Sequence, residues 1–349
     1  MIITDGLELC NRLRNLFYSR SNAKKMILMD EKRFDVISLG RLAIDLYANE
    51  IGSELAKVKS FNVYAGGCPT NVAVGTRRLG LRVSMVSRIG TDGLSDGVMD
   101  FMRAEGIHTD YVVHDEEHLT GLAFLSILPP DKFPLVYYRP DPADLYLTLD
   151  DLARVPMDHS RVLFVAGTNF SAEPSRSTNL AAMERARDAG VDVIIDLDKR
   201  PTLWRDLRTY GANMRSALPL VDIVIGTEDE ITAAADEANV EKAVHILIQA
   251  AVKVKAIAVK RGQAGSEIFM PDGSSHVAKP FKVKVLNVLG AGDAWASGFI
   301  FGYLSGWDWA KCARFGNATG AIIVTRHACA NDMPTHEQVT AFIESQGGF

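Results

Sequence analysis

From residue 34 onward, short apolar segments of strand length alternate with longer segments that have helical periodicity. The predicted strands are residues 34–39, 84–89, 162–166, 191–197, 223–225 and 256–260. The predicted helices are residues 71–79, 96–105, 177–189, 228–235, 241–253, 292–305, 309–324 and 335–346. This alternation predicts an α/β fold, with a mostly parallel central sheet and helices on both faces. Ligands of such sheets bind at the carboxyl ends of the strands.

Two segments interrupt the alternation, at about residues 47–64 and 120–139. In the second, apolar segments flank Pro129-Pro130-Asp131, a pattern typical of a β-hairpin. The sequence contains no linker-like stretch after residue 33, so we expect residues 34–349 to form one domain with these two insertions. Residues 1–33 differ in pattern, and they are either the product of an upstream start or a helical extension that packs on the domain.

Composition excludes several classes of partner. The net charge is -5 and no basic block occurs, which argues against nucleic-acid binding. No apolar run reaches the length that spans a membrane. The four cysteines are scattered without metal-ligand spacing, which is typical of reduced thiols in a cytoplasmic protein.

A glycine-rich turn enters the predicted helix at residues 292–305. Gly290, Ala291 and Gly292 leave no bulky side chain near the backbone, so the free N–H groups at the helix start can bind phosphate. Asp293 then lies beside the phosphate, where a carboxylate can take a proton from an attacking hydroxyl. The alternative role of Asp293 is that of an ordinary helix N-cap. The sequence has no P-loop motif, and no G-x-G-x-x-G follows the first strand, which disfavours P-loop enzymes and dinucleotide-dependent dehydrogenases.

A second glycine pair supports the interpretation that the turn at residues 290–292 binds phosphate. Gly66 and Gly67 precede a predicted helix that carries Asn71, and the next strand ends in Gly90-Thr91-Asp92. With the Gly-Ala-Gly-Asp turn, these segments resemble the ribokinase (PfkB-type) family of carbohydrate kinases over about residues 34–340. The resemblance implies a ribokinase-like three-layer sandwich with a small β-sheet lid formed by the two insertions. It also implies ATP, Mg²⁺, and a homodimer through the lid.

Other segments resemble one branch of that family, the 5-dehydro-2-deoxygluconokinases. They include Gly40-Arg41, Asp45-Leu46-Tyr47, Tyr138-Arg139, the stretch 196–204 and the stretch 329–335. That branch phosphorylates the C6 hydroxyl of a sugar acid with ATP. The alternative substrates are 2-keto-3-deoxygluconate, fructose and ribose, and a remote alternative is a sugar-binding protein without catalysis.

The resemblance also implies roles for individual residues. Asp293 is the general base, and Gly290, Ala291 and Gly292 face the transferring phosphoryl group. The residues expected to bind the sugar hydroxyls are Asp45, Gly66, Gly67 and Asn71. The arginines expected to bind its carboxylate are Arg139, Arg200 and, as a third candidate, Arg41, each with a surface ion pair as its alternative.

On the nucleotide side, the implied residues are Thr227, Lys260, Gly262, Gly265, Asn317 and Asn331. Glu230 corresponds to a glutamate that positions Mg²⁺ through water, although Thr227 replaces the asparagine that the family usually has three residues earlier. Asn287 replaces an aspartate that helps to bind an activating monovalent cation in the family. Because Asn287 lacks that charge, we expect activation by K⁺ to be weaker.

Overall fold

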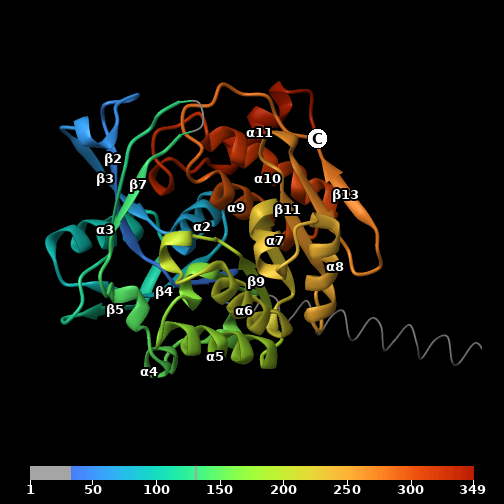
Figure 1. Ribbon diagram of the computed structural model, residues 1–349, viewed down its shortest axis with the longest axis horizontal. Coiled ribbons are helices and arrows are strands. Elements are labelled where there is room, and N and C mark those ends of the chain that lie inside the picture. Colours follow the sequence, from blue (N-terminus) through green and yellow to red (C-terminus); the bar gives the residue numbers. More distant parts are fainter. Residues whose placement is uncertain (1–32, 130–131) are drawn as a thin grey trace, which may run out of the picture.

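The computed structural model describes residues 33–129 and 132–349. Its centre is a nine-stranded sheet with the order β13-β12-β11-β10-β9-β8-β1-β4-β5 (Figure 1). Seven neighbouring strands are parallel, namely β5 (His108–Asp115), β4 (Val83–Gly90), β1 (Val36–Leu39), β8 (Val162–Ala166), β9 (Asp192–Asp196), β10 (Ile223–Thr227) and β11 (Ala256–Lys260). At one edge, β12 (Ser266–Phe269) and β13 (Ser275–Ala278) continue the sheet antiparallel.

Helices cover both faces of this sheet and bury alternate side chains of its strands. Val36 packs in a core with α2 (Cys68–Arg78), α3 (Gly93–Ala104), α9 (Ala291–Leu304) and α10 (Trp309–Ile323). Its neighbour Ile37 points to the opposite core, which is formed with α5 (Ser175–Asp188), α6 (Leu207–Ala217), α7 (Glu228–Ala235) and α8 (Val240–Ala250). The last helix, α11 (His336–Ser345), packs against α10 in a separate cluster. The predicted three-layer α/β architecture is therefore confirmed.

All eight predicted helices are present within a few residues of the predicted bounds, and the bounds of α7 are the same as those predicted. The elements that were not predicted include β5, β12, β13, α6 and the short helix α4 (Leu149–Leu152). In α6, Gly211 weakens the helical pattern, yet a Cβ there would lie 2.7 Å from the carbonyl oxygen of Ala233. The close packing of α6 on α7 thus requires a residue that local helix propensity disfavours.

A second, four-stranded sheet contains the two segments that interrupt the alternation. Its order is β3 (Phe61–Gly66), β2 (Ala43–Ala48), β6 (Leu122–Leu125) and β7 (Leu135–Tyr138), and the predicted hairpin is β6 with β7. Figure 1 shows β2, β3 and β7 together at one end of the molecule. The register places Asp45, Ala123 and Tyr137 side by side on neighbouring strands. Because side chains directly across a sheet share a face, these three point the same way.

The predictions for residues 1–32 lie outside the described residues. Among the helices of the described ranges, none combines the length and the apolar character that a membrane crossing requires. The cysteines of this part of the chain, Cys68, Cys312 and Cys329, are buried free thiols.

Candidate active site

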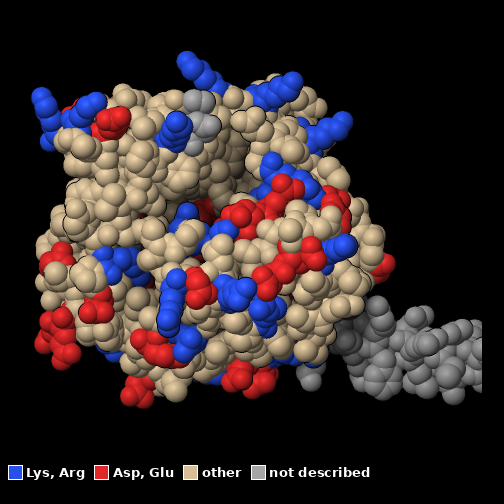
Figure 2. Space-filling model, in the orientation of Figure 1, with Lys and Arg blue, Asp and Glu red and all other residues tan. Residues whose placement is uncertain are grey.

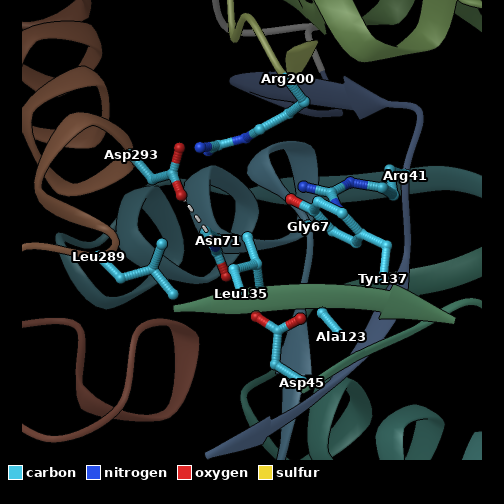
Figure 3. A pocket seen from close by; sticks show the side chains of 10 residues that line it. All are labelled: Arg41, Asp45, Gly67, Asn71, Ala123, Leu135, Tyr137, Arg200, Leu289 and Asp293. Atoms are coloured by element: carbon cyan, nitrogen blue, oxygen red, sulfur yellow. Dashed lines mark hydrogen bonds between the residues drawn. The ribbon is translucent and has the colours of Figure 1, made fainter. Parts of the chain in front are cut away.

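A cavity lies between the small sheet and the carboxyl ends of the main strands. Its lining comes from the loops after β1 and β9, the small sheet, α2 and α9; it consists of Arg41, Asp45, Gly67, Asn71, Ala123, Leu135, Tyr137, Arg200, Leu289 and Asp293 (Figure 3). Figure 2 shows the surface hollowed on the face of Figure 1, with basic and acidic side chains around the hollow. Six of these residues were predicted as site residues from the sequence. They lie far apart in the chain, and the fold brings them together.

The glycine-rich turn begins α9 and leaves the helix start without a side-chain cap. The N-cap is Gly290, whose φ of 81° lies in the left-handed region, and no side chain accepts a hydrogen bond from the first-turn amides. A Cβ at Gly290 would lie 2.3 Å from Sγ of Cys329, so only glycine fits there. Asp293 is the third residue of the helix, three positions after the N-cap Gly290, and is not itself the N-cap. The uncapped amides at the positive end of the helix dipole are suited to an anion.

Asp293 is buried beside this turn and is held by α2. Its Oδ2 accepts a hydrogen bond of 2.6 Å from Nδ2 of Asn71, and the thiol of Cys329 lies 3.8 Å from the same oxygen. Burial raises the pKa of Asp293, and the charge of Asp198 adds to this, while the hydrogen bond from Asn71 works against it. A carboxylate with a raised pKa is a stronger base, which suits proton abstraction near neutral pH.

Lys260, at the end of β11, directs its ammonium to the same turn. Its Nζ lies 3.0 Å from the position that a Cβ of Gly292 would take, and 2.8 Å from Oδ2 of Asp196. Burial raises the pKa of Asp196 to about 7, against the opposing effect of Lys260. An anion on the amides of the turn would therefore also meet the ammonium of Lys260, which Asp196 holds in place.

Arg200 reaches the cavity from the loop after β9. Its Nε lies 2.9 Å from Oδ1 of Asp198, whose other oxygen accepts a 3.1 Å hydrogen bond from Thr168. Burial works to raise the pKa of Asp198, but Arg200 and Arg41 hold it below its usual value. Figure 3 shows the guanidinium of Arg200 ending beside the carboxylate of Asp293. Arg200 can therefore contact a ligand group that lies next to Asp293.

Asp45 reaches the cavity from β2 of the small sheet. Its carboxyl group occupies the space where Gly66, on the neighbouring strand, would carry a side chain, because a Cβ there would lie 2.1 Å from Cγ of Asp45. Burial raises the pKa of Asp45 to about 6. Gly66 thus makes room for Asp45, and Gly67, with a φ of 103°, turns the chain into α2. The side-chain oxygen of Asn71 is also buried there without a partner, which leaves an acceptor for a ligand hydroxyl.

The three predicted arginines have different surroundings. Arg41 and Arg200 line the cavity. Arg139 does not, because it forms a buried ion pair with Asp144, in which Nη2 and Oδ2 are 2.8 Å apart. The structure therefore places two of the three guanidinium groups at the cavity.

Thr227 and Glu230 form a capping box at the start of α7. The hydroxyl of Thr227 accepts from N of Glu230, and Oε2 of Glu230 accepts a 2.7 Å hydrogen bond from N of Thr227. The other oxygen, Oε1, accepts from N of Lys199 at 3.1 Å. Each carboxylate oxygen can accept a second hydrogen bond, so Glu230 can still bind water. The described residues contain no group of three or more acidic, histidine or cysteine side chains that could hold a metal ion by themselves.

Asn317 and Asn331, two predicted nucleotide residues, make bonds within the protein. The oxygen of Asn317 accepts from Ser266 and from the indole of Trp295, and its amide donates to the carbonyls of Ala278 and Lys279, all at 2.9 Å. Asn331 accepts from N of Ala65 at 3.3 Å. Asn317 thus links α10 to α9, β12 and β13, and Asn331 links residues 330–332 to β3. The predicted glycines Gly262 and Gly265 form the turn between β11 and β12, with φ of 54° and 97°.

Asn287, at the predicted cation position, links two loops beside the glycine-rich turn. Its Nδ2 donates to the carbonyl of His327 at 3.1 Å, and its Oδ1 accepts from N of Leu289 at 3.0 Å. An aspartate could not make the first of these bonds, because its oxygens do not donate when ionised.

Tyr137, Asp198 and Cys329 also shape the site, although the sequence did not predict them as site residues. Tyr137 lies in the predicted hairpin, where alternate residues face opposite sides, and the sequence alone did not indicate which side faces the site. Asp198 belongs to the stretch Asp196-Leu197-Asp198-Lys199-Arg200, and its proximity to Arg200 in the sequence was a usable signal. The contact of Cys329 with Gly290 and Asp293 follows only from the fold.

Known proteins share this sequence and architecture. The model of the pfkB family carbohydrate kinases matches residues 33–336. The 5-dehydro-2-deoxygluconokinase of Shouchella clausii is 36% identical over 90% of this chain and 97% of its own length. The enzyme of the same description from Bacillus subtilis is 33% identical over 92% of this chain and 99% of its own. Fructokinase from Xylella fastidiosa, solved with bound ATP, superposes with a TM-score of 0.81 at 25% identity, covering 90% of this chain and 99% of its own.

The chain belongs to the pfkB family of carbohydrate kinases. It is a carbohydrate kinase with a ribokinase-like fold, as the family resemblance implied.

Proposed function

We propose that this kinase transfers the γ-phosphoryl group of ATP to the C6 hydroxyl of 5-dehydro-2-deoxygluconate. The names of the relatives that are 32–36% identical over almost the whole chain support this substrate. The observation that carries the catalytic part is the geometry of one turn. A buried carboxylate, Asp293, lies beside uncapped amides and a lysine, with a cavity for a small polar ligand in front of it.

In the proposed reaction, Asp293 takes the proton of the sugar hydroxyl as its oxygen attacks the γ-phosphorus. The new P–O bond forms on the sugar as the bond to the β-phosphate oxygen breaks, and ADP leaves with that electron pair. The amides of Gly290, Ala291 and Gly292, together with Lys260, offset the negative charge of the transferring group. The small sheet covers the cavity and excludes water that would otherwise hydrolyse ATP.

Mg²⁺ fits the site as an ion held chiefly by the nucleotide phosphates and water, which is its usual mode in kinases. Glu230 is the described side chain that we assign to that water shell, because its oxygens keep spare acceptor capacity. When bound, the ion would neutralise phosphate charge. We assign three further parts of the chain to the nucleotide side of the site. They are the turn formed by Gly262 and Gly265, the N-cap residue Thr227, and the residues Asn317 and Asn331.

We also propose that the enzyme dimerises through the outer face of the small sheet. On β7, Leu135 and Tyr137 point to the cavity, while Val136 and Tyr138 are 43% and 61% exposed on the other face. Val63 on β3 adds a further exposed apolar side chain. An apolar sheet face of this kind is typical of an interface between subunits. Sedimentation of wild type and of Tyr138→Lys tests this, because a charge in the interface should shift the protein towards monomer.

A panel of phosphate acceptors tests the proposed reaction. With ATP and Mg²⁺, kcat/KM is measured for 5-dehydro-2-deoxygluconate, 2-keto-3-deoxygluconate, fructose and ribose, and the phosphorylated carbon is located by NMR. We expect the first substrate to have the highest kcat/KM and to carry phosphate on C6. A preference for fructose or ribose would contradict the substrate while leaving the kinase activity intact, and no turnover of any acceptor would contradict catalysis itself.

A further inference from the structure

Arg41 is a buried cation with no partner of opposite charge in direct contact. The residue is 5% exposed, and its Nε is buried without a hydrogen-bond partner. Within the described ranges, no carboxylate oxygen comes within ion-pair distance of its guanidinium, in contrast to Arg139 with Asp144 and Arg200 with Asp198. Burial works to lower the pKa of Arg41, but Tyr137 and Asp198 more than offset this, so the side chain stays charged. No carboxylate of the described residues pairs directly with this charge, so the carboxylate of a ligand can serve as its counterion.

Arg41 contacts α2 through its backbone and the small sheet through its guanidinium. The residue follows β1, and its carbonyl accepts a 3.0 Å hydrogen bond from the hydroxyl of Thr70 in α2. The same carbonyl lies 2.5 Å from the position of a Cβ on Gly67, so the two backbone segments are in close contact. At the other end, the guanidinium carbon lies 5.8 Å from the ring centre of Tyr137, within the range of a cation–π contact. Arg41 is thus fixed between α2 and the small sheet, with its charge directed into the cavity.

The cavity has two different ends. Figure 3 shows Asp293 with the tip of Arg200 on one side, and Arg41 with Tyr137 on the opposite side. Asp45 lies between these ends on the small sheet, together with Ala123. In a six-carbon sugar acid the carboxylate and the primary hydroxyl are at opposite ends of the carbon chain. The cavity matches that arrangement if the hydroxyl lies at Asp293.

We propose that Arg41, supported by Tyr137, binds the carboxylate of the sugar acid and so sets the direction in which the substrate lies, whereas Arg139 has a structural role. This inference rests on the proposed function for the identity of the substrate. Arg139 does not bind the carboxylate, because its own counterion, Asp144, is 4% exposed and already paired with it. The guanidinium of Arg41 has N–H donors without an ion-pair partner, and the two oxygens of a carboxylate can accept hydrogen bonds from them.

The inference makes different predictions for two arginines when each is replaced by methionine. Arg41→Met removes a charge that has no ion-pair partner and is attracted only at longer range by Asp198, so the Tm without ligand should fall only slightly. Arg139→Met leaves the carboxylate of Asp144 buried without its partner, so the Tm should fall. A Tm of Arg41→Met that falls as far as that of Arg139→Met would overturn the inference, because Arg41 would then have a structural counterion.

Ligand binding supplies the second test, with D-gluconate as a carboxylate probe and D-glucitol as its neutral counterpart of the same length. Gluconate should raise the Tm of wild type more than glucitol does, and Arg41→Met should abolish that difference. In folded Arg139→Met the difference should persist. Absence of the difference in wild type, or its persistence in Arg41→Met, would overturn the inference.

Kinetics separate this inference from the proposed reaction. The ratio of kcat/KM for the sugar acid to that for fructose should fall roughly 10- to 100-fold in Arg41→Met, as expected for the loss of charge-assisted hydrogen bonds. Arg41→Lys should recover part of the ratio, because it restores the charge without the planar donors. If wild type prefers fructose while gluconate binding still depends on Arg41, the proposed substrate is wrong and the role of Arg41 stands.

Discussion

Asn71 donates a 2.6 Å hydrogen bond to Asp293 and so joins the first turn of α2 to the first turn of α9 across the cavity. The two residues come from the two separate glycine-rich segments, 222 positions apart in the sequence. The bond holds Oδ2 of the proposed base in place. The sugar side and the phosphate side of the site are therefore connected at the atom that is proposed to take the proton.

Replacing Asn71 tests this connection through the pH dependence of catalysis. Asp293 acts as a base only when ionised, so kcat should fall as the pH falls through its pKa. Asn71→Asp places a second carboxylate beside it, which should raise that pKa further and move the acid limb of the pH profile to higher pH.

Asn71→Ala is the matched control, because it removes the hydrogen bond without adding a charge. It should lower kcat by roughly 10-fold, as expected for a lost hydrogen bond to a charged group. Since the hydrogen bond of Asn71 lowers the pKa of Asp293, this variant should also shift the limb upwards, but less than Asn71→Asp. Identical profiles in all three proteins would show that Asp293 does not titrate in catalysis.

Gly290→Ala should strongly impair phosphoryl transfer. The new Cβ would lie 2.3 Å from Sγ of Cys329, at a φ of 81° that alanine disfavours, so the turn must move. A loss of ~10²-fold in kcat is expected, in line with the removal of a donor to a developing oxyanion.

Gly93→Ala provides the comparison for Gly290→Ala, since Gly93 also lies at a helix start and a Cβ there meets nothing within 4 Å. It should retain the activity of wild type. Combining Gly290→Ala with Cys329→Ala removes the sulfur and should recover part of the loss; equal activity of the single and double variants would indicate that backbone strain alone causes the defect.

The ionised carboxylate of Asp45 should lower the free energy of unfolding at neutral pH. Its pKa in the folded protein is about 6, above the ordinary value of 3.8, so the folded state disfavours the ionised form. The penalty is absent below about pH 4, develops between that value and 6, and is complete above 6. The shift corresponds to ~3 kcal/mol in the free energy of unfolding.

Asp45→Asn should therefore raise the free energy of unfolding at pH 8 relative to wild type, and should have much less effect at pH 4, as measured by urea denaturation. The same variant should raise KM for the sugar, because the carboxylate is expected to accept hydrogen bonds from its hydroxyls. A variant that is less stable at pH 8 would show that Asp45 has a stabilising role in the free enzyme.

K⁺ should stimulate this enzyme only weakly. Asn287 has no formal charge and its amide is bonded to the carbonyl of His327, so a cation there would lack the attraction of an aspartate. Rates in K⁺ and in a bulky organic cation should be similar. Asn287→Asp would lose the donor to His327 and should lower the Tm, which separates a structural asparagine from a cation ligand. Strong K⁺ dependence of wild type would contradict this view.

The sequence predicted the architecture because the repeating pattern of apolar residues reflects the burial of strands and helices. It also predicted Asp293, Asn71 and Asp45 as site residues, since each belongs to a short motif with its own local geometry, and all three line the cavity. What it could not predict are contacts between distant segments. The thiol of Cys329 against Gly290 and the ring of Tyr137 beside Arg41 depend on how the small sheet and the last loops close over the cavity.

Arg139 illustrates the same limit, because here the sequence predicted a residue at the cavity that the structure places elsewhere. The sequence placed all three arginines near the substrate, and nothing in a local pattern distinguishes a guanidinium that is free from one that is paired. In the structure, Asp141 has a φ of 44°, in the left-handed region, and Arg139 forms its ion pair with Asp144 five positions away. The role of an arginine in a site thus depends on which carboxylate lies within ion-pair distance of it in the folded protein.

The most direct test of the account is the rate of phosphoryl transfer by Asp293→Asn, measured as kcat with saturating ATP and 5-dehydro-2-deoxygluconate, alongside the Kd for ATP. Asparagine keeps the size of the side chain but cannot accept the proton. We predict a loss of ~10²–10⁴-fold in kcat, the usual contribution of a general base, with the Kd for ATP largely unchanged. A variant with kcat within a few-fold of wild type would contradict the assignment of Asp293 as the base.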